Sequence, residues 1–267
     1  MNKKREFNRI SKDIKSVKIQ GARNIAKAGL KAYNLIPTKA SKNKLLSLRP
    51  TEPMLEKVLN LTLTLKENQI LQHFKDAQNS INKHTFKLIK NNSVIFTHCH
   101  STNVTQALIN AKNKGKTFQV YNTETRPLYQ GRKTAKELSK AKISVTMFTD
   151  NALGVALSKE TGKKPSAVFL GADALTKKGV INKIGSETIA KIAKQGKIPV
   201  YIIADSWKYT SKKIPIEQRG LNEVWDKAPK HIKIKNPAFE FVPKELITKI
   251  VTEYGAQTYG EFLKRVR

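Results

Sequence analysis

The sequence predicts an α/β fold, in which a small helical N-terminal domain (residues 1–88) precedes a parallel-sheet domain (residues 89–267). Apolar residues recur at helical spacing up to about His84, whereas short β-branched runs alternate with helical segments after about Lys90. Strict alternation of strands and helices is typical of βαβ units, whose strands lie parallel in one sheet. A chain of 267 residues is long enough for one large domain or two modest ones.

The first domain is expected to contain helices bounded by prolines. Two groups of apolar residues have helical spacing: Ile25, Leu30, Ala32 and Leu35, then Met54, Leu55, Val58, Leu61 and Leu65. Proline disrupts a helix interior but is tolerated in the first turn, so these prolines mark helix boundaries: Pro37, Pro50 and Pro53. The basic segment over residues 1–16 lacks a strong apolar face and is expected to be a solvated arm.

The second domain is expected to contain five strands buried on both faces. Their apolar runs cover residues 93–98, 118–122, 143–148, 167–172 and 199–205. Residues with helical spacing follow at 105–115, 132–141, 151–162 and 187–197. After about Tyr209 the alternation weakens, and residues 231–255 offer one more extended stretch, a break at Asn236 and Pro237, and a terminal helix. In such a sheet, ligands bind at the carboxyl ends of the strands, near a topological switch point.

The net charge favours anionic partners without identifying one. Lys and Arg number 51 against 20 Asp and Glu, which gives a formal charge of +31 and a pI near 10.2. A phosphorylated substrate or a nucleic acid would suit this charge. However, Lys is scattered through nearly every segment, whereas nucleic-acid-binding proteins concentrate Arg and aromatic residues. Charge spread over solvated faces is therefore favoured, and nucleic-acid binding stays an alternative.

The sequence lacks the features of secreted and membrane proteins. Cys99 is the only cysteine and cannot form a disulfide within the chain, and no segment resembles a signal peptide. No uncharged apolar run reaches the roughly 18 residues that a membrane-spanning helix needs. We expect a cytoplasmic protein that does not contact a membrane.

Cys99 lies between two histidines in the sequence FTHCHSTNV (residues 96–104). If the strand continues through it, His98 and His100 point to one side and Cys99 to the other, so no metal site is expected. Cys99 is then either a buried apolar residue or a thiol whose pKa is lowered by the following helix N-terminus. The residues at the start of that helix are suited to bind phosphate: Ser101, Thr102 and Asn103.

The second strand is followed by a loop that is expected at the same edge of the sheet as Cys99. Glu124 and Arg126 either pair with each other or belong to a binding loop, which Pro127 and Gly131 would shape. Gln130 offers an uncharged donor and acceptor to a sugar hydroxyl.

The fourth strand is followed by Asp173, with Asn182 and Lys183 one loop further on. An aspartate at this position is either a turn residue or part of a site. A carboxylate, an amide, an ammonium and a thiol at one edge of a sheet are suited to proton transfer on an anionic substrate. The fifth strand adds Asp205 and Lys208.

Four motifs resemble one superfamily over most of the chain: THCHS, ETRPLYQG, GADALTKKGVINKIGS and NPAFEFVPKELI. The superfamily unites ribose-1,5-bisphosphate isomerases, methylthioribose-1-phosphate isomerases and the regulatory alpha, beta and delta subunits of eukaryotic initiation factor two-B. The resemblance implies a helical N-terminal domain followed by a Rossmann-like domain, assembled as a homodimer or a homohexamer.

The resemblance also implies which residues act. The isomerases carry the cysteine of THC and the aspartate of GAD, here Cys99 and Asp173, whereas the translation-factor subunits typically lack this pair. By resemblance, the Cys99 thiolate removes a proton from C2 of a sugar phosphate, and Asp173 acts as acid and base on the ring oxygen or hydroxyls. Burial must raise the pKa of Asp173 if it is to donate a proton.

The substrate-binding positions implied by the resemblance are Gln20, Gly21, Ala22, Arg23, Arg49, Ser101, Thr102, Asn103, Arg126, Gln130, Asn182, Lys183 and Lys208. Gln20 is a departure, because the isomerases usually begin this turn with Arg and read Arg-Gly-Ala-Gly.

The expected function is an aldose–ketose isomerase that converts ribose 1,5-bisphosphate to ribulose 1,5-bisphosphate. His100 and Ser101 resemble that branch, and a bisphosphate suits a basic pocket. A methylthioribose-1-phosphate isomerase and a non-catalytic regulatory subunit are the alternatives. No metal or redox cofactor is expected, and AMP is implied as an activator by the resemblance alone.

Overall fold

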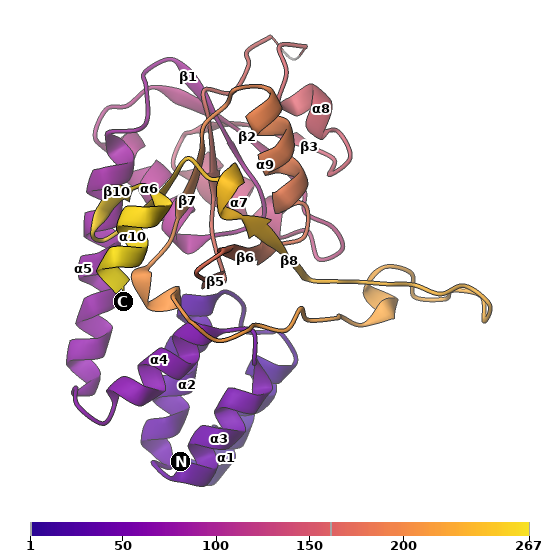
Figure 1. Cartoon of the computed structure of the whole chain (residues 1–267). Coiled ribbons are helices and arrows are strands. Elements are labelled where there is room, and N and C mark those ends of the chain that lie inside the picture. The colour runs from indigo at the N-terminus through magenta and orange to yellow at the C-terminus, as the bar shows by residue number, and fades with distance from the viewer. Residues whose placement is uncertain (1, 161, 267) are drawn as a thin grey trace.

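The chain folds into a bundle of helices and an α/β body, which lie one above the other in Figure 1. The computed structural model describes residues 2–160 and 162–266, so Met1, Thr161 and Arg267, which fall within the predicted ranges, lie outside the described residues. The predicted order, helices first and a mostly parallel sheet second, is confirmed. No helix in the described part of the chain is long and apolar enough to cross a membrane.

Helices α1 to α4 form a small bundle with its own apolar core. Their bounds are α1 Lys3–Lys15, α2 Ala22–Leu35, α3 Lys39–Leu48 and α4 Pro53–Leu61. The expectation of a solvated N-terminal arm is wrong, because Phe7, Ile10 and Ile14 of α1 are buried in this core. These three residues recur at intervals of three and four, so one narrow face suffices to hold an otherwise basic helix.

Helix α5 (Glu67–Phe86) connects the bundle to the sheet. Ile70 and Phe74 in its first half pack against α2 and α4, whereas Ile81 near its end packs in the apolar core of the sheet. One helix therefore contributes to both cores and holds the bundle against one edge of the α/β body.

Seven strands form the central sheet in the order β10-β9-β7-β4-β1-β2-β3. Their bounds are β1 Ser93–Thr97, β2 Phe118–Thr123, β3 Ser144–Phe148, β4 Ala167–Leu170, β7 Val200–Ile203, β9 Lys249–Thr252 and β10 Gly255–Gln257. All neighbours are parallel except β9 and β10. From β1 the chain moves outwards through β2 and β3, and from β4 it moves the other way through β7 and β9. The boundary between β1 and β4 is therefore the topological switch point.

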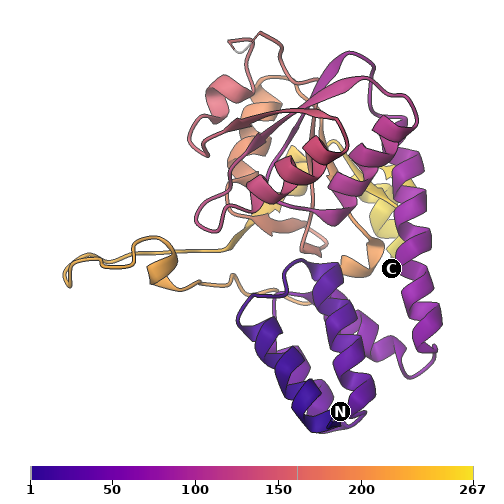
Figure 2. The ribbon, with the colours of Figure 1, turned by 180° about the vertical axis from the view of Figure 1, so that it is seen from behind.

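Helices cover both faces of the sheet, as Figures 1 and 2 show from opposite sides. Helices α5, α6 (Thr102–Asn113) and α7 (Gln130–Lys140) pack on one face. Helices α8 (Leu153–Ala156), α9 (Ser186–Gln195) and α10 (Tyr259–Val266) pack on the other. Successive strand residues point to opposite faces, so Ile95 joins the first core and Phe96 the second.

A second, antiparallel sheet begins directly after the carboxyl end of β4. It consists of β5 (Ala174–Leu175), β6 (Gly179–Lys183) and β8 (Phe239–Pro243). Short 3-10 helices are η1 Ser206–Lys208, η2 Leu221–Glu223 and η3 Lys244–Leu246. The sequence gives little sign of this sheet, because its strands have at most five residues and come from distant segments.

Three elements differ from the sequence prediction. Strand β3, predicted to be buried on both faces, is an edge strand with three of its five residues exposed. Within residues 151–162 the only helix in the described part is α8, which has four residues. The terminal helix predicted at the end of residues 231–255 is replaced by β9 and the start of β10, and α10 begins at Tyr259. Ile250 and Val251 of β9 are buried in opposite cores, and such a short apolar run does not distinguish a strand from a helix.

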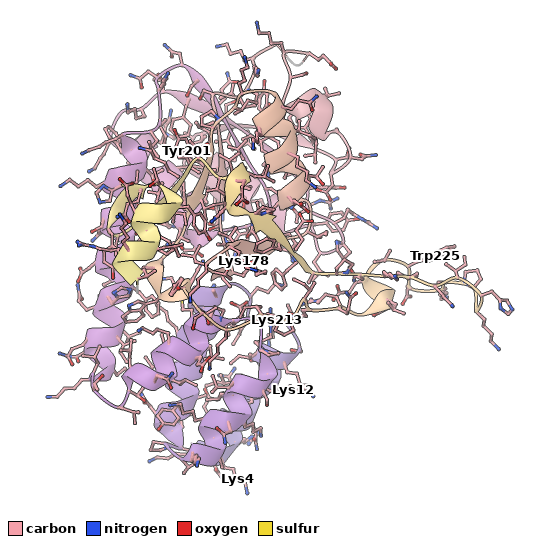
Figure 3. The ribbon with its side chains drawn as sticks, viewed as in Figure 1. Lys4, Lys12, Lys178, Tyr201, Lys213 and Trp225 are labelled. Carbon is pink, nitrogen blue, oxygen red and sulfur yellow. The ribbon has the colours of Figure 1, made fainter. Side chains whose placement is uncertain are left out.

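Residues 211–235 form an arm that leaves the body and extends to the right in Figure 1. None of its side chains is buried. Five of its large apolar residues are between 39% and 53% exposed: Ile216, Leu221, Val224, Trp225 and Ile232. Figure 3 shows Trp225 far out on this arm. At the base, the buried side-chain amide of Asn236 donates to the carbonyl oxygen of Gly220 (3.0 Å), so the Asn-Pro motif closes the arm.

Candidate active site

A cavity lies at the carboxyl ends of β1 and β4, where the winding direction of the sheet reverses. Cys99 follows β1, Asp173 follows β4, and both residues line the cavity. The space between its lining side chains is about 920 Å³, counting the part open to solvent. In doubly wound sheets, ligands bind in the crevice at this point. The cavity therefore lies where the sequence predicts the ligand site.

The structure brings together all but one of the residues implied as the site. Around Cys99 and Asp173, the cavity is lined by Gln20, Gly21, Ala22, Arg23, Arg49, Ser101, Thr102, Asn103, Gln130, Asn182, Lys183 and Lys208. Arg126 is not among the lining residues. It is exposed, and its guanidinium donates a hydrogen bond to the Tyr129 hydroxyl.

The loop that contains Arg126 is held by a residue that the motif did not indicate. Glu124 does not pair with Arg126 but forms an ion pair with Arg132 (3.0 Å). The carboxylate of Asp150, just after β3, accepts hydrogen bonds from the backbone N–H groups of Thr125 (2.9 Å) and Arg126 (2.5 Å). Asp150 therefore fixes the backbone of the loop from the neighbouring strand.

Gly131 lets the start of α7 approach β2 closely. A Cβ atom at this position would lie 1.8 Å from the carbonyl oxygen of Thr123. The side-chain amide of Asn122 donates to the Gly131 carbonyl oxygen (2.9 Å). This close contact sets the position of Gln130 at the cavity.

Cys99 is held through its backbone. The strand does not continue through the cysteine, because β1 ends at Thr97 and Cys99 has a left-handed backbone with φ of 62°. Its N–H donates to Thr125 Oγ1 (3.0 Å), and its carbonyl oxygen accepts from Thr134 Oγ1 (2.8 Å). Two threonines from neighbouring segments thus fix the turn that presents the thiol.

His98 connects three segments of the site. Its Nε2 lies 2.8 Å from the Ile184 carbonyl oxygen, which can only accept, so Nε2 carries the proton. Nδ1 therefore accepts from Thr123 Oγ1 (2.5 Å). Burial lowers the pKa of His98 to about 4, so the imidazole is neutral at pH 7 and joins the ends of β1 and β2 to the loop before α9.

His100 is also neutral at pH 7. Burial, together with the charge of Lys133, lowers its pKa to about 4. Its Nδ1 lies 3.1 Å from the hydroxyl of Thr134, the residue that also binds the Cys99 carbonyl. His100 therefore supports the same turn as Cys99.

The Cys99 thiol is protonated in the site as it stands. Burial raises its pKa to about 11, against the lowering effect of the Lys183 ammonium. The sequence favoured a lowered pKa because α6 starts nearby. Burial outweighs that effect, so the thiol is the resting form and the thiolate a minor population.

Asp173 has the raised pKa that an acid needs. Burial raises it, against the lowering effects of Lys208, Lys183 and Arg49. Lys208 is itself buried and donates from Nζ to the carbonyl oxygen of Ala172 (2.6 Å). The Lys208 ammonium is thus held at the residue that precedes Asp173, whose pKa it lowers.

Two helix N-termini, one from each domain, meet at the cavity. Ser101 caps α6, and its hydroxyl accepts from the Val104 N–H (3.5 Å). Helix α2 begins after Gly21, which has φ of 83° and provides no side-chain cap. Arg23 is held by α5, since it donates to the Phe74 carbonyl oxygen (2.8 Å). Helix N-termini bind anions, so the cavity has two such places.

Several cavity residues were not found from the sequence. They are Val17, Glu52, Lys133, Arg219 and Phe239. Glu52 lies three residues after Arg49 in the LRPTEP segment and could have been considered with it. Arg219 gave no local signal, because only the three-dimensional path of the arm brings it to the site.

The fold and the site define a class: a doubly wound α/β protein with a thiol, a carboxyl group and two anion-binding helix ends at its switch point. The chain belongs to the Initiation factor 2 subunit family, whose family model matches residues 10–259.

Known relatives include sugar-phosphate isomerases. The chain is 34% identical to the ribose 1,5-bisphosphate isomerase of Methanocaldococcus jannaschii, over 91% of this chain and 88% of the relative. It is 38% identical to the 5-deoxyribose 1-phosphate isomerase of Clostridium botulinum, over 72% of this chain and 60% of the relative. The fold is that of the translation initiation factor eIF-2B of Pyrococcus horikoshii, with a TM-score of 0.82 at 24% identity, covering 94% of this chain and 96% of that one.

We predict that Gly131→Ala destabilises the protein by about 1–3 kcal/mol, because a Cβ atom cannot fit against the β2 backbone without moving it. Urea unfolding measures the change. Gly154→Ala is the matched control, since a Cβ atom at Gly154 would meet no atom within 4 Å outside its own stretch of helix. Equal stabilities of the two variants would show that the contact with Thr123 does not constrain the loop.

Proposed function

We propose that this chain is an aldose–ketose isomerase that converts ribose 1,5-bisphosphate to ribulose 1,5-bisphosphate. The observation that carries the proposal is the meeting of Cys99, Asp173 and two helix N-termini in one cavity. The relatives that are sugar-phosphate isomerases support the reaction class.

Cys99 and Asp173 together can supply and accept every proton that the reaction moves. Neutral Asp173 protonates the ring oxygen as the bond from C1 to that oxygen breaks, while the Cys99 thiolate removes the C2 proton. The product of these steps is an enol with a double bond between C1 and C2. The enol hydroxyl on C2 then returns its proton to Asp173, and the Cys99 thiol protonates C1. The ketose is released with both groups in their starting forms.

A substrate with two phosphates fits the distribution of positive groups. Helix α2 offers the N-terminus around Gly21 to Arg23, and α6 offers the N-terminus around Ser101 to Asn103. Lys183 and Lys208 add ammonium groups to the same cavity. A 5-deoxyribose 1-phosphate would use only one of the two helix ends, and the similarity to an isomerase of that compound makes it the second candidate.

The proposed reaction moves protons and needs neither a redox cofactor nor a metal ion. We also propose AMP as an activator, supported only by the resemblance to ribose-1,5-bisphosphate isomerases. Turnover with and without AMP tests this point, and equal rates would contradict it.

We predict that the purified protein forms ribulose 1,5-bisphosphate, and that Cys99→Ser and Asp173→Asn each lower kcat by about 10²–10⁴-fold. Both residues exchange protons with the substrate, and the substituted side chains cannot. Product formation is measured by chromatography, with 5-deoxyribose 1-phosphate as a competing substrate. The control is Asp76→Asn, at an exposed position on α5. Full activity of either cavity variant, with an unchanged circular dichroism spectrum, would contradict the mechanism.

We further propose that the protein assembles as a homodimer, or as a homohexamer built from such dimers. In either assembly, the arm of one copy packs on a second copy. Five partly exposed apolar side chains on an extended segment without a core favour a protein partner. The arm carries charges of both signs, among them Glu217, Arg219, Glu223 and Asp226, which suits a self-complementary contact.

We predict that Trp225→Glu shifts the protein from dimer to monomer at micromolar concentration, because the charge would be buried in the contact. Sedimentation velocity measures the shift. Leu63→Glu is the matched control, since Leu63 is 76% exposed on the connection between α4 and α5. A Trp225→Glu protein that sediments like the unaltered one would contradict the role of the arm.

A further inference from the structure

Glu52 is a buried carboxyl group in the cavity that the proposed mechanism does not use. It immediately precedes α4, is 3% exposed and lines the cavity together with Arg49. A buried carboxylate that does not contact water must form an ion pair and hydrogen bonds, or it takes up a proton. The partners of Glu52 therefore indicate which form it adopts.

The partners of Glu52 and Arg49 are incomplete. Glu52 Oε1 lies 3.4 Å from Arg49 Nη2, whereas Glu52 Oε2 has no hydrogen-bond partner within the described parts of the chain. Arg49 Nη2 also contacts Glu217 Oε2 (3.3 Å), and its Nε and Nη1 have no partner there. One carboxyl oxygen and two guanidinium nitrogens are thus buried beside the cavity without partners, which native proteins avoid unless a ligand or water satisfies them.

The charges around Glu52 favour its neutral form. Burial raises its pKa to about 8, with Asp173 and Glu217 acting in the same direction and Arg49 and Lys208 acting against it. At pH 7 most molecules therefore carry a proton on Glu52. Because Oε1 accepts from Arg49, the free oxygen Oε2 is the place for that proton, and it becomes a donor.

We propose that Glu52, as a neutral carboxylic acid, donates a hydrogen bond to a phosphate oxygen of the sugar phosphate, beside the N–H groups of Arg49. The inference rests on the proposed function, which supplies a sugar phosphate as the ligand of this cavity. Oε2–H and the two unpartnered guanidinium nitrogens of Arg49 together offer three donor atoms to one anionic group.

Ionisation of Glu52 would end this contact. A carboxylate cannot donate, and it would repel a phosphate at close range in a site with little water. Only the protonated fraction then binds the phosphate in this way, so the apparent Kd grows as that fraction falls. Above the pKa of the carboxyl group, each pH unit reduces the fraction about tenfold.

We predict that the affinity for ribose 1,5-bisphosphate falls about tenfold per pH unit above pH 8, and that Glu52→Gln removes this dependence. Glutamine keeps a donor at the same place but cannot ionise. Calorimetric titration from pH 7 to pH 10 measures both proteins in the Cys99→Ser background, which prevents turnover. Glu56→Gln is the matched control, one turn further along α4, where Glu56 pairs with Lys212.

The outcomes separate this inference from the proposed function. If the affinity of the Glu52→Gln protein falls with rising pH as steeply as that of the Glu56→Gln protein, Glu52 does not bind the phosphate. This conclusion holds whether or not the isomerase reaction occurs. If the affinity depends on Glu52 but Cys99-containing protein forms no ketose, the proposed reaction is wrong and the role of Glu52 stands.

A second measurement reports the protonation of Glu52 without any ligand. The folded protein keeps the proton up to about pH 8, whereas the unfolded chain releases it near pH 4.5, so between these values unfolding releases a proton and the free energy of unfolding falls as the pH rises. The melting temperature of Glu52→Gln should therefore rise relative to that of Glu56→Gln from pH 5 to pH 9. A constant difference would overturn the assignment of a neutral Glu52.

Discussion

The reversal of winding between β1 and β4 is the constraint on which the site depends. Crossover connections between parallel strands are right-handed, so reversing the direction of winding puts α6 and α9 on opposite faces of the sheet. The chain segments after β1 and β4 then separate and leave a crevice between them. Cys99 and Asp173 are distant in sequence, and this crevice is what brings them to the same cavity.

Burial then determines the charge of that crevice. It pushes Cys99, Asp173 and Glu52 towards their protonated forms, so the acidic groups of the site contribute less negative charge than their number suggests. The cations Arg49, Lys183 and Lys208 are consequently incompletely neutralised. Protonated acids beside fixed cations form a receptor for an anion. The proton on Asp173 is also the one that the proposed reaction uses, whereas Cys99 must first lose its proton to act as the base. Local desolvation, more than the net charge of +31, therefore makes the cavity suited to an anion.

The sequence was sufficient for the parts of the fold whose signals are local. The apolar runs of β1, β2, β4 and β7 are long enough to be recognised, and the rule for parallel sheets places their carboxyl ends at one edge. Strand β9 was missed because Ile250 and Val251, buried on opposite faces, have the same pattern in a helix. The pKa of Cys99 was misjudged because proximity to α6 can be read from the sequence, whereas the depth of burial cannot.

The residues of the site that were missed share one property: their role depends on segments far away in the chain. Arg219 reaches the cavity only because the arm is closed at Asn236, and Glu52 becomes a candidate donor chiefly because distant segments bury it beside the cavity. Gln20 to Arg23, which were named from the resemblance alone, line the cavity where α2 begins. Arg126 belongs to the motif but turns to Tyr129, which no sequence pattern indicates.

Ion pairs connect the arm to the cavity. Glu217 contacts Arg49 (3.3 Å) and Arg219 (3.2 Å), and Arg219 contacts Glu223 (3.0 Å), so a row of ion pairs runs from the cavity into the arm. Removing one partner of a buried pair leaves the other charge uncompensated. If the arm moved away, Arg49 would keep only Glu52 as its anionic partner, and the loss of the Glu217 charge would lower the pKa of Glu52. A displacement of the arm would therefore shift Glu52 towards its carboxylate form, although burial is the main cause of its raised pKa.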